Sequence, residues 1–150
     1  GRLPSRVTHN DTKINNVMLD DKSGVGVCVI DLDTCMPGSV LYDFGDEIRT
    51  TTATAAEDER DLSKVKFDLD LYDALVNGYL STAGGFLTDE EKRLLPFSGI
   101  LLTFECGLRF LTDFLEGDVY FKIHRDGHNL DRCRTQFELV RQMETCFPHP

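Results

Sequence analysis

The chain has 150 residues, of which 41% are hydrophobic, and its formal net charge is −10. This length and apolar content are enough for one domain with a single hydrophobic core. The acidic balance argues against nucleic acid or an anionic membrane as a partner, because both select basic patches. Charges at Glu105, Arg109 and Asp113 interrupt the longest apolar stretch, which argues against a membrane span.

From the N-terminus, the first predicted elements are short strands. Arg6–Thr8 is a β-prone run, and residues 17–19 and 25–30 form two more, joined by a polar turn at 20–24. Segment 9–16 is therefore a loop in front of a hairpin, and Asp31 follows the second strand of that hairpin. We expect the polar side chains of the loop and Asp31 to converge at the mouth of the hairpin.

This loop carries the most informative pattern of the chain, H-x-D-x-K-x-x-N, followed fifteen residues later by an aspartate. His9, Asp11, Lys13 and Asn16 are its fixed positions, and Asp31 is the later aspartate. Asp11 can accept the proton of an attacking hydroxyl, Lys13 can neutralise the phosphate in transfer, and Asn16 with Asp31 can hold Mg²⁺ against the phosphates of ATP. The pattern predicts the catalytic loop of a kinase-like fold. The alternative is a polar β-hairpin with a surface turn.

Neighbouring residues leave several roles open. Asp33 lies two residues beyond Asp31 and could hold a second metal, contact the acceptor, or be a solvated carboxylate. A literal D-F-G begins at Asp43, but its spacing favours Asp31 as the metal ligand. We expect Asp43 to cap the next helix or to brace the catalytic loop. Lys13 could alternatively be an exposed loop lysine, and His9 is expected to orient other groups rather than to act as a base.

Segments 9–20 (HNDTKINNVMLD) and 28–49 (CVIDLDTCMPGSVLYDFGDEIR) resemble the aminoglycoside phosphotransferase and choline kinase family, whose members are relatives of the protein kinases. Segment 101–144 is similar to the C-terminal part of the N-acetylhexosamine 1-kinases within that family. The resemblance implies transfer of the γ-phosphate of ATP, with Mg²⁺, to the anomeric hydroxyl of an N-acetylhexosamine. It also places the metal aspartate at Asp31 and a structural aspartate at Asp43. Choline, homoserine and aminoglycosides remain alternative acceptors, and the acidic surface suits a cationic one.

The rest of the chain predicts helices. The first expected helix runs from Asp43 to about Thr52, and the second covers 71–80 and stops at Gly84-Gly85. A third helical region begins at the capping box at Thr88 and ends at Gly117, in two pieces divided near 96–99. The last helix is expected over 130–144. Segment 50–56 is expected to be a mobile connection, and the acidic runs at 57–59 and 68–73 solvated surface. The predicted fold is α+β, mainly α: the C-terminal lobe of a protein-kinase-like fold, with the catalytic loop and a small β-hairpin on a helical bundle.

A kinase-like enzyme also needs a Gly-rich turn between strands, a strand lysine and a helix glutamate to clamp the nucleotide. Only eight residues precede His9, and no such pattern follows it. We therefore expect 1–150 to be the C-terminal catalytic and substrate lobe of a longer protein without its N-terminal lobe. The isolated fragment would be inactive, could act as a binding or lobe-docking module, and would self-associate through exposed apolar surface.

Segment 116–129 is the expected acceptor-binding element, because it places aromatic, basic and imidazole side chains in an irregular stretch between two apolar helices. Tyr120 and Arg125 are its first candidates, and Arg109 on the preceding helix is a third. The alternative is an ordinary polar helix connection, with Arg109 extending from its helix to solvent.

The five cysteines are odd in number and show no C-x-x-C spacing. This usage predicts free thiols, each buried as a small apolar residue, in a reducing cytoplasm, with no zinc site.

Overall fold

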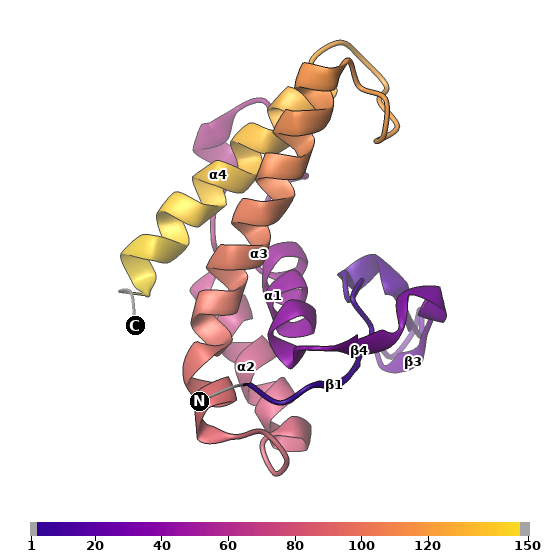
Figure 1. Ribbon diagram of the computed structural model, residues 1–150, viewed down its shortest axis with the longest axis vertical. Helices are drawn as coiled ribbons and strands as arrows, with labels where there is room; N and C mark the ends of the chain where they lie inside the picture. The colour runs from indigo at the N-terminus through magenta and orange to yellow at the C-terminus, as the bar shows by residue number, and fades with distance from the viewer. Residues whose placement is uncertain (1–2, 148–150) are drawn as a thin grey trace.

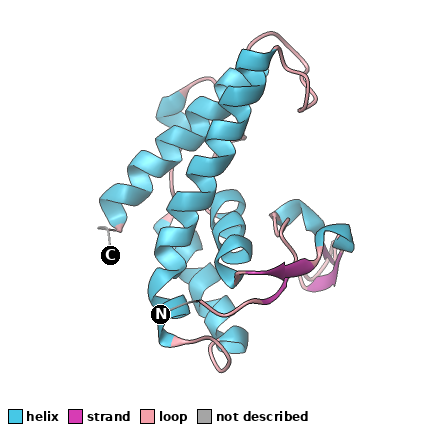
Figure 2. Cartoon of the chain, viewed as in Figure 1, coloured by secondary structure: helices cyan, strands magenta, loops and turns pink. Residues whose placement is uncertain are grey.

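The computed structural model describes residues 3–147, which form four helices and two small antiparallel sheets (Figures 1 and 2). The elements in chain order are β1 (Arg6–Thr8), β2 (Val17–Leu19), β3 (Gly26–Val29), β4 (Met36–Gly38), α1 (Val40–Thr51), α2 (Leu69–Ala83), α3 (Asp89–Glu116) and α4 (His128–Cys146). The mainly helical α+β class predicted from the sequence is confirmed.

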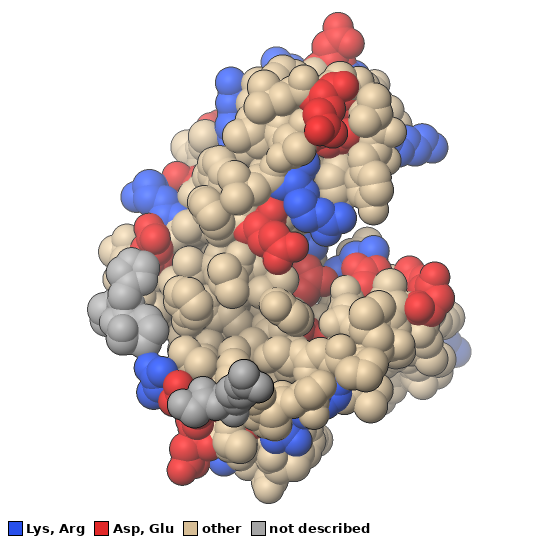
Figure 3. Space-filling model, in the orientation of Figure 1, with Lys and Arg blue, Asp and Glu red and all other residues tan. Residues whose placement is uncertain are grey.

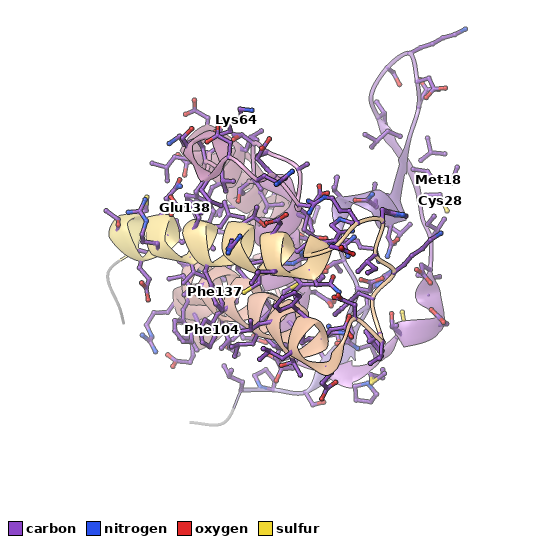
Figure 4. All side chains as sticks on the ribbon, turned by 90° about the horizontal axis from the view of Figure 1, so that it is seen from above. Met18, Cys28, Lys64, Phe104, Phe137 and Glu138 are labelled. Carbon is purple, nitrogen blue, oxygen red and sulfur yellow. The ribbon has the colours of Figure 1, made fainter. Side chains whose placement is uncertain are left out.

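The two sheets lie to one side of the helices (Figure 1). β1 pairs with β4, with Val7 opposite Pro37, and β2 pairs with β3, with Met18 opposite Cys28. Seen from above, Met18 and Cys28 lie well away from the helical bundle (Figure 4). Large apolar side chains of this β region are exposed, among them Ile14, Met18, Leu19, Val25, Val27, Val29, Ile30, Leu32 and Met36. The described residues therefore leave this apolar surface uncovered.

Helix α3 is the centre of the bundle and packs along both α1 and α4. Glycines allow the close approach to α1, since a Cβ on Gly45 would lie 2.5 Å from the carbonyl oxygen of Ser98. On the α4 side, Phe104 and Phe137 stack with ring centroids 5.7 Å apart (Figure 4). The core itself consists of Phe44, Ile48, Val65, Tyr72, Leu95, Ile100, Leu139 and Met143.

Helix α3 corrects the expectation of two pieces, because it runs unbroken for 28 residues with Pro96 inside it. The proline removes a backbone donor, and the helix continues through a turn that packs closely on α1, where Ser98 lies against Gly45 and Gly99 against Ile48. The helix contains an 18-residue stretch with mean hydropathy 1.5, so by length and composition alone it could cross a membrane, a test that core helices of soluble proteins also pass. Its packing between α1 and α4 identifies it as the core helix of this bundle.

Three further expectations need correction. Helix α1 begins at Val40 rather than at Asp43 and is capped by Ser39, so the cap is excluded as one of the two roles left open for Asp43. The connection after α1 is tied to the rest of the chain, because Ala53 forms a β-bridge with Phe67 and Thr54 N donates to Lys66 O over 3.1 Å. All five cysteines are free, but only Cys133 is buried; Cys106 is partly buried and Cys28, Cys35 and Cys146 are exposed.

Candidate active site

The catalytic loop is braced from below by the first turn of α1. The carboxylate of Asp43 accepts hydrogen bonds from the backbone N–H groups of His9 (2.9 Å) and Asn10 (2.7 Å). Thr12 Oγ1 donates to the carbonyl oxygen of Asp43 over 2.6 Å. Asn10 has φ of 64°, a left-handed conformation that asparagine tolerates better than most residues. Of the two roles left open for Asp43, the contacts fit the brace.

Asp11 lies at the centre of this loop with its carboxylate held from two sides. Its Oδ2 accepts Lys13 Nζ at 2.8 Å and Asn16 Nδ2 at 2.9 Å. Partial burial acts to raise the pKa of Asp11, but the hydrogen bonds from Lys13 and Asn16 outweigh it and hold the pKa below the usual range. Asp11 is therefore ionised at neutral pH, and Oδ1 is the oxygen left to meet a hydroxyl.

Asn16, Asp31 and Asp33 form the oxygen-rich side of the loop. The pKa of Asp31 is raised because its carboxyl shares a hydrogen bond with Asp33 and experiences that second negative charge, with Asp11 adding to the effect. Since Asn16 Nδ2 is bound to Asp11, the Asn16 Oδ1 atom is free for a cation. Crowded carboxylates next to an amide oxygen are a donor set that suits Mg²⁺, a hard cation that prefers oxygen and keeps several waters.

Within residues 3–147, no group of three or more His, Cys, Asp or Glu side chains is arranged to hold a metal by itself. A cation bound here would need water and phosphate oxygens to complete its coordination, as Mg²⁺ at nucleotide sites commonly does.

His9 connects the loop to the residue before Asp31. Its Nε2 lies 3.1 Å from the carbonyl oxygen of Ile30, and Thr34 Oγ1 donates to the backbone oxygen of His9 over 2.6 Å. The other ring nitrogen, Nδ1, is buried and has no hydrogen-bond partner among the described residues. With its Nε2 at the carbonyl oxygen of Ile30, His9 is placed to orient the strand end that precedes Asp31.

A cavity of about 500 Å³ opens beside Asp11. It lies between the predicted catalytic loop on one side and the C-terminal part of α3, the loop after it and the beginning of α4 on the other. Figure 3 shows this face of the molecule hollowed between the upper part of the bundle and the smaller β region. Asp11 and Lys13 border the cavity on one side, and Arg109, Tyr120 and Phe121 border it on the other. Two of the three acceptor candidates, Tyr120 and Arg109, thus face the catalytic loop across one space.

Tyr120 and Phe121, called the aromatic wall below, are linked to Arg109 by stacking contacts. The guanidinium carbon of Arg109 lies 5.9 Å from the ring centroid of Tyr120 and 5.4 Å from that of Phe121. The two rings meet edge to face at 4.8 Å. Arg109 therefore does not extend freely to solvent; it is packed on the wall, where a planar cation beside an aromatic face can recognise ring and hydroxyl groups.

The third candidate, Arg125, does not border this cavity. It pairs with Asp131 and, at 3.3 Å, with Asp58, and His128 Nε2 lies 3.0 Å from the same Asp58 carboxylate. These contacts tie the 116–127 loop to the segment after α1. The position fits a structural role for Arg125. The acidic run at 57–59 remains partly exposed, as expected, with the side chains of Glu57 and Asp58 about 40% exposed, but its carboxylates also form ion pairs.

The cavity also contains charged residues that sequence reasoning did not select. Arg49 Nη1 pairs with Glu57 at 2.8 Å, and Arg132 Nε lies 3.6 Å from the other oxygen of Glu57. The positive side chains at the cavity are Lys13, Arg49, Arg109, Lys122 and Arg132, and the negative ones are Asp11 and Glu57. The lining of this cavity thus has more positive than negative side chains in a chain of net charge −10, with Arg49 paired in addition to Asp46 at 2.9 Å. No local sequence pattern predicts this charge cluster, because Arg49, Glu57 and Arg132 are far apart in the sequence and come together only in the fold.

Comparison with known families agrees with this geometry. Residues 1–82, more than half of the chain, match the family described as the phosphotransferase enzyme family, APH. Enzymes of this family are kinases that use ATP to phosphorylate hydroxyl groups of small molecules. The matched range contains the catalytic loop, Asp31 and Asp43, whereas Arg109 and the aromatic wall lie beyond it. The chain therefore belongs to the APH phosphotransferase family.

Proposed function

We propose that this chain is the C-terminal catalytic and substrate lobe of an ATP-dependent kinase that phosphorylates the anomeric hydroxyl of an N-acetylhexosamine. The observation that carries the proposal is the cavity of about 500 Å³ with Asp11 on one side and Arg109 and Tyr120 on the other. Its size is in the range of small-molecule sites. An aromatic face with a fixed guanidinium opposite the base is suited to a sugar ring with its hydroxyls.

In this proposal Asp11 orients the acceptor hydroxyl and takes its proton at Oδ1, while Lys13 and Asn16 keep the carboxylate in place through Oδ2. Its lowered pKa keeps Asp11 ionised and therefore able to accept a hydrogen bond from the hydroxyl, and the loose transition state of phosphoryl transfer depends mainly on positioning. Asn16, Asp31 and Asp33 would hold Mg²⁺, which neutralises phosphate charge when bound. Asp43 holds the backbone of the loop through His9 and Asn10, and the ring of His9 holds the end of the strand that precedes Asp31.

The charge of the cavity lining supports a neutral acceptor over a cationic one. Choline and aminoglycosides are cations, and five positive side chains face two carboxylates at the cavity. Like charges brought together in a partly desolvated site are unfavourable. A neutral acceptor such as an N-acetylated sugar avoids this cost, even though the acidic outer surface would attract a cation from a distance. The cavity, which is the part that contacts the acceptor, favours the sugar.

The test is ³¹P NMR of the upstream-extended protein with Mg-ATP and, in separate reactions, N-acetylglucosamine, N-acetylgalactosamine, glucosamine, choline and an aminoglycoside. We expect a sugar 1-phosphate resonance with the N-acetylated sugars. The matched control is Asp11→Asn, which should stay folded and lose activity by about a thousandfold, the scale of a lost catalytic base. A product from choline or the aminoglycoside alone would keep the kinase and reject the sugar.

A second candidate function is a lobe-docking module, which the exposed apolar β region favours. Residues such as Val27 (67% exposed) and Val25 (63%) need a cover in water. We propose that the nucleotide-clamping N-terminal lobe covers them in the complete, cytoplasmic protein, and that the isolated chain self-associates there and is inactive. Sedimentation at tens of micromolar tests this: Val27→Thr should weaken association, and a wild-type monomer would contradict it.

A further inference from the structure

Asp113, in the last turn of α3, is a buried carboxylate that the proposed chemistry does not use. It is 3% exposed, and the hydrogen bonds found for its carboxylate come from neutral donors rather than from a lysine or arginine. Its Oδ1 accepts the backbone N–H of Tyr120 at 2.7 Å, and its Oδ2 accepts the backbone N–H of Phe121 at 2.9 Å. One carboxylate thus holds the backbone of both residues of the aromatic wall.

Asn129, at the start of α4, completes this arrangement. It is fully buried, and its Nδ2 donates to Asp113 Oδ2 and to Asp118 Oδ1, both at 2.8 Å. Its Oδ1 accepts Arg132 Nη1 at 3.0 Å, and Arg132 also donates to the carbonyl oxygen of Lys122 over 3.3 Å. The backbone from 118 to 122 is therefore fixed at both ends by side chains of α3 and α4.

These bonds matter most for Tyr120. Phe121 also packs on the buried Phe110, with ring centroids 4.7 Å apart. Tyr120 is 73% exposed, and the ring contacts found for it among the described residues are with Phe121 and with the guanidinium of Arg109. A side chain this exposed in an irregular loop keeps its position only if its backbone is held. The carboxylate of Asp113 supplies that hold, since hydrogen bonds from backbone N–H to an ionised acceptor are stronger than neutral ones.

We propose that Asp113 is a positioning residue for the acceptor. Without touching the acceptor, it fixes Tyr120 and Phe121 at the cavity opposite Asp11 and thereby sets acceptor affinity. The inference rests on the proposed function for its acceptor and extends it by a residue outside the catalytic loop and outside the range matched by the family. It also explains why an exposed aromatic loop can act as a defined wall.

The test compares Asp113→Asn with wild type in the complete protein. Asparagine keeps the size but offers one acceptor oxygen, so one backbone N–H loses its partner and the new NH₂ faces another donor. We expect KM for the acceptor to rise about tenfold, the loss expected for one charge-assisted hydrogen bond, with KM for ATP unchanged and kcat within about twofold. The control is Asp126→Asn, in the same loop, which should change none of these values.

Amide hydrogen exchange provides a readout that needs no acceptor. In wild type the amides of Tyr120 and Phe121 should be protected although the loop is on the surface. Asp113→Asn should expose these two amides while the amides in the core of α3 and α4 stay protected. Unprotected wild-type amides would overturn the inference. An active wild type with an unchanged acceptor KM in Asp113→Asn would overturn it as well. A wild type that phosphorylates no acceptor in the panel would overturn the proposed function, and this inference with it.

Discussion

Replacing Asp43 by asparagine distinguishes a brace for the loop from a metal ligand, the role that the D-F-G motif suggests. Loss of a brace should lower stability and leave the Mg²⁺ requirement unchanged, whereas loss of a metal ligand should raise the Mg²⁺ requirement. The carboxylate accepts the backbone N–H groups of His9 at 2.9 Å and Asn10 at 2.7 Å. Asparagine can accept only one of them, and its NH₂ group then points at the other donor. The change therefore removes one hydrogen bond to a charged acceptor and leaves one backbone N–H without a partner.

The expected magnitude follows from these contacts. A hydrogen bond to a charged group contributes about 1.5–3 kcal/mol, so Asp43→Asn should lower the free energy of unfolding by about 2 kcal/mol. With a urea dependence of about 1–3 kcal/mol per molar for a domain of this size, the unfolding midpoint should fall by about 1 M. Far-UV circular dichroism can follow the transition, because most of the ordered residues are helical. The Mg²⁺ concentration for half-maximal activity should stay unchanged.

Asp31→Asn is the matched control for this prediction. Asp31 has φ of 64°, which asparagine tolerates, and its carboxylate is crowded by Asp33. Its replacement should leave the free energy of unfolding unchanged or slightly higher, and should raise the Mg²⁺ requirement at least about tenfold. If Asp43→Asn instead kept full stability and shifted the Mg²⁺ requirement, Asp43 would be the metal ligand and the assignment of Asp31 would be wrong.

Three other predictions concern packing, pH and the acceptor. Gly107→Ala should cost about 1–3 kcal/mol of stability in urea unfolding, because its Cβ would lie 2.7 Å from the ring of Phe137; a neutral effect would contradict the close packing of α3 on α4. Hydrogen bonds from Arg6 hold the pKa of Glu91 at about 2 although burial opposes them. This contribution is complete above the ordinary pKa of 4.5 and is lost as pH falls towards 2, so the destabilisation by Glu91→Gln should be larger at about pH 5 than at about pH 3. Arg109→Gln should raise KM for the acceptor about tenfold with KM for ATP unchanged; equal effects on both would place Arg109 at the nucleotide instead.

The hairpin beside the predicted catalytic loop could be read from the sequence because its information is local. Its strands and turn are evident in the sequence, and β2 and β3 form as expected. The capping box at Thr88 and the stop at Gly117 are equally local signals, and both mark the ends of α3. Such features depend on neighbours in the chain and are independent of how the helices pack.

The features that the sequence did not reveal depend on distant contacts. Pro96 predicts a break in α3, and only the close packing on α1 shows why the helix continues. Glu57 belongs to an acidic run typical of solvated surface, yet it lies between Arg49 and Arg132. Arg125 and Arg109 are both arginines near an irregular loop, and only the fold shows that the first is paired with carboxylates while the second borders the cavity.

The contrast between overall and local charge has a physical consequence for selectivity. At physiological ionic strength the field of the acidic surface is screened within about 8 Å, so it influences the approach of a ligand more than its bound state. In the proposed function, screening is weaker within the cavity, and its cationic side chains would act directly on the acceptor and on the phosphate in transfer. The side chains that would disfavour a cationic acceptor would also stabilise the negative charge of the transferring phosphoryl group. The same cationic side chains would thus affect both acceptor selectivity and the rate of phosphoryl transfer. Substitutions of these side chains that allow a cationic acceptor to bind should therefore also lower kcat.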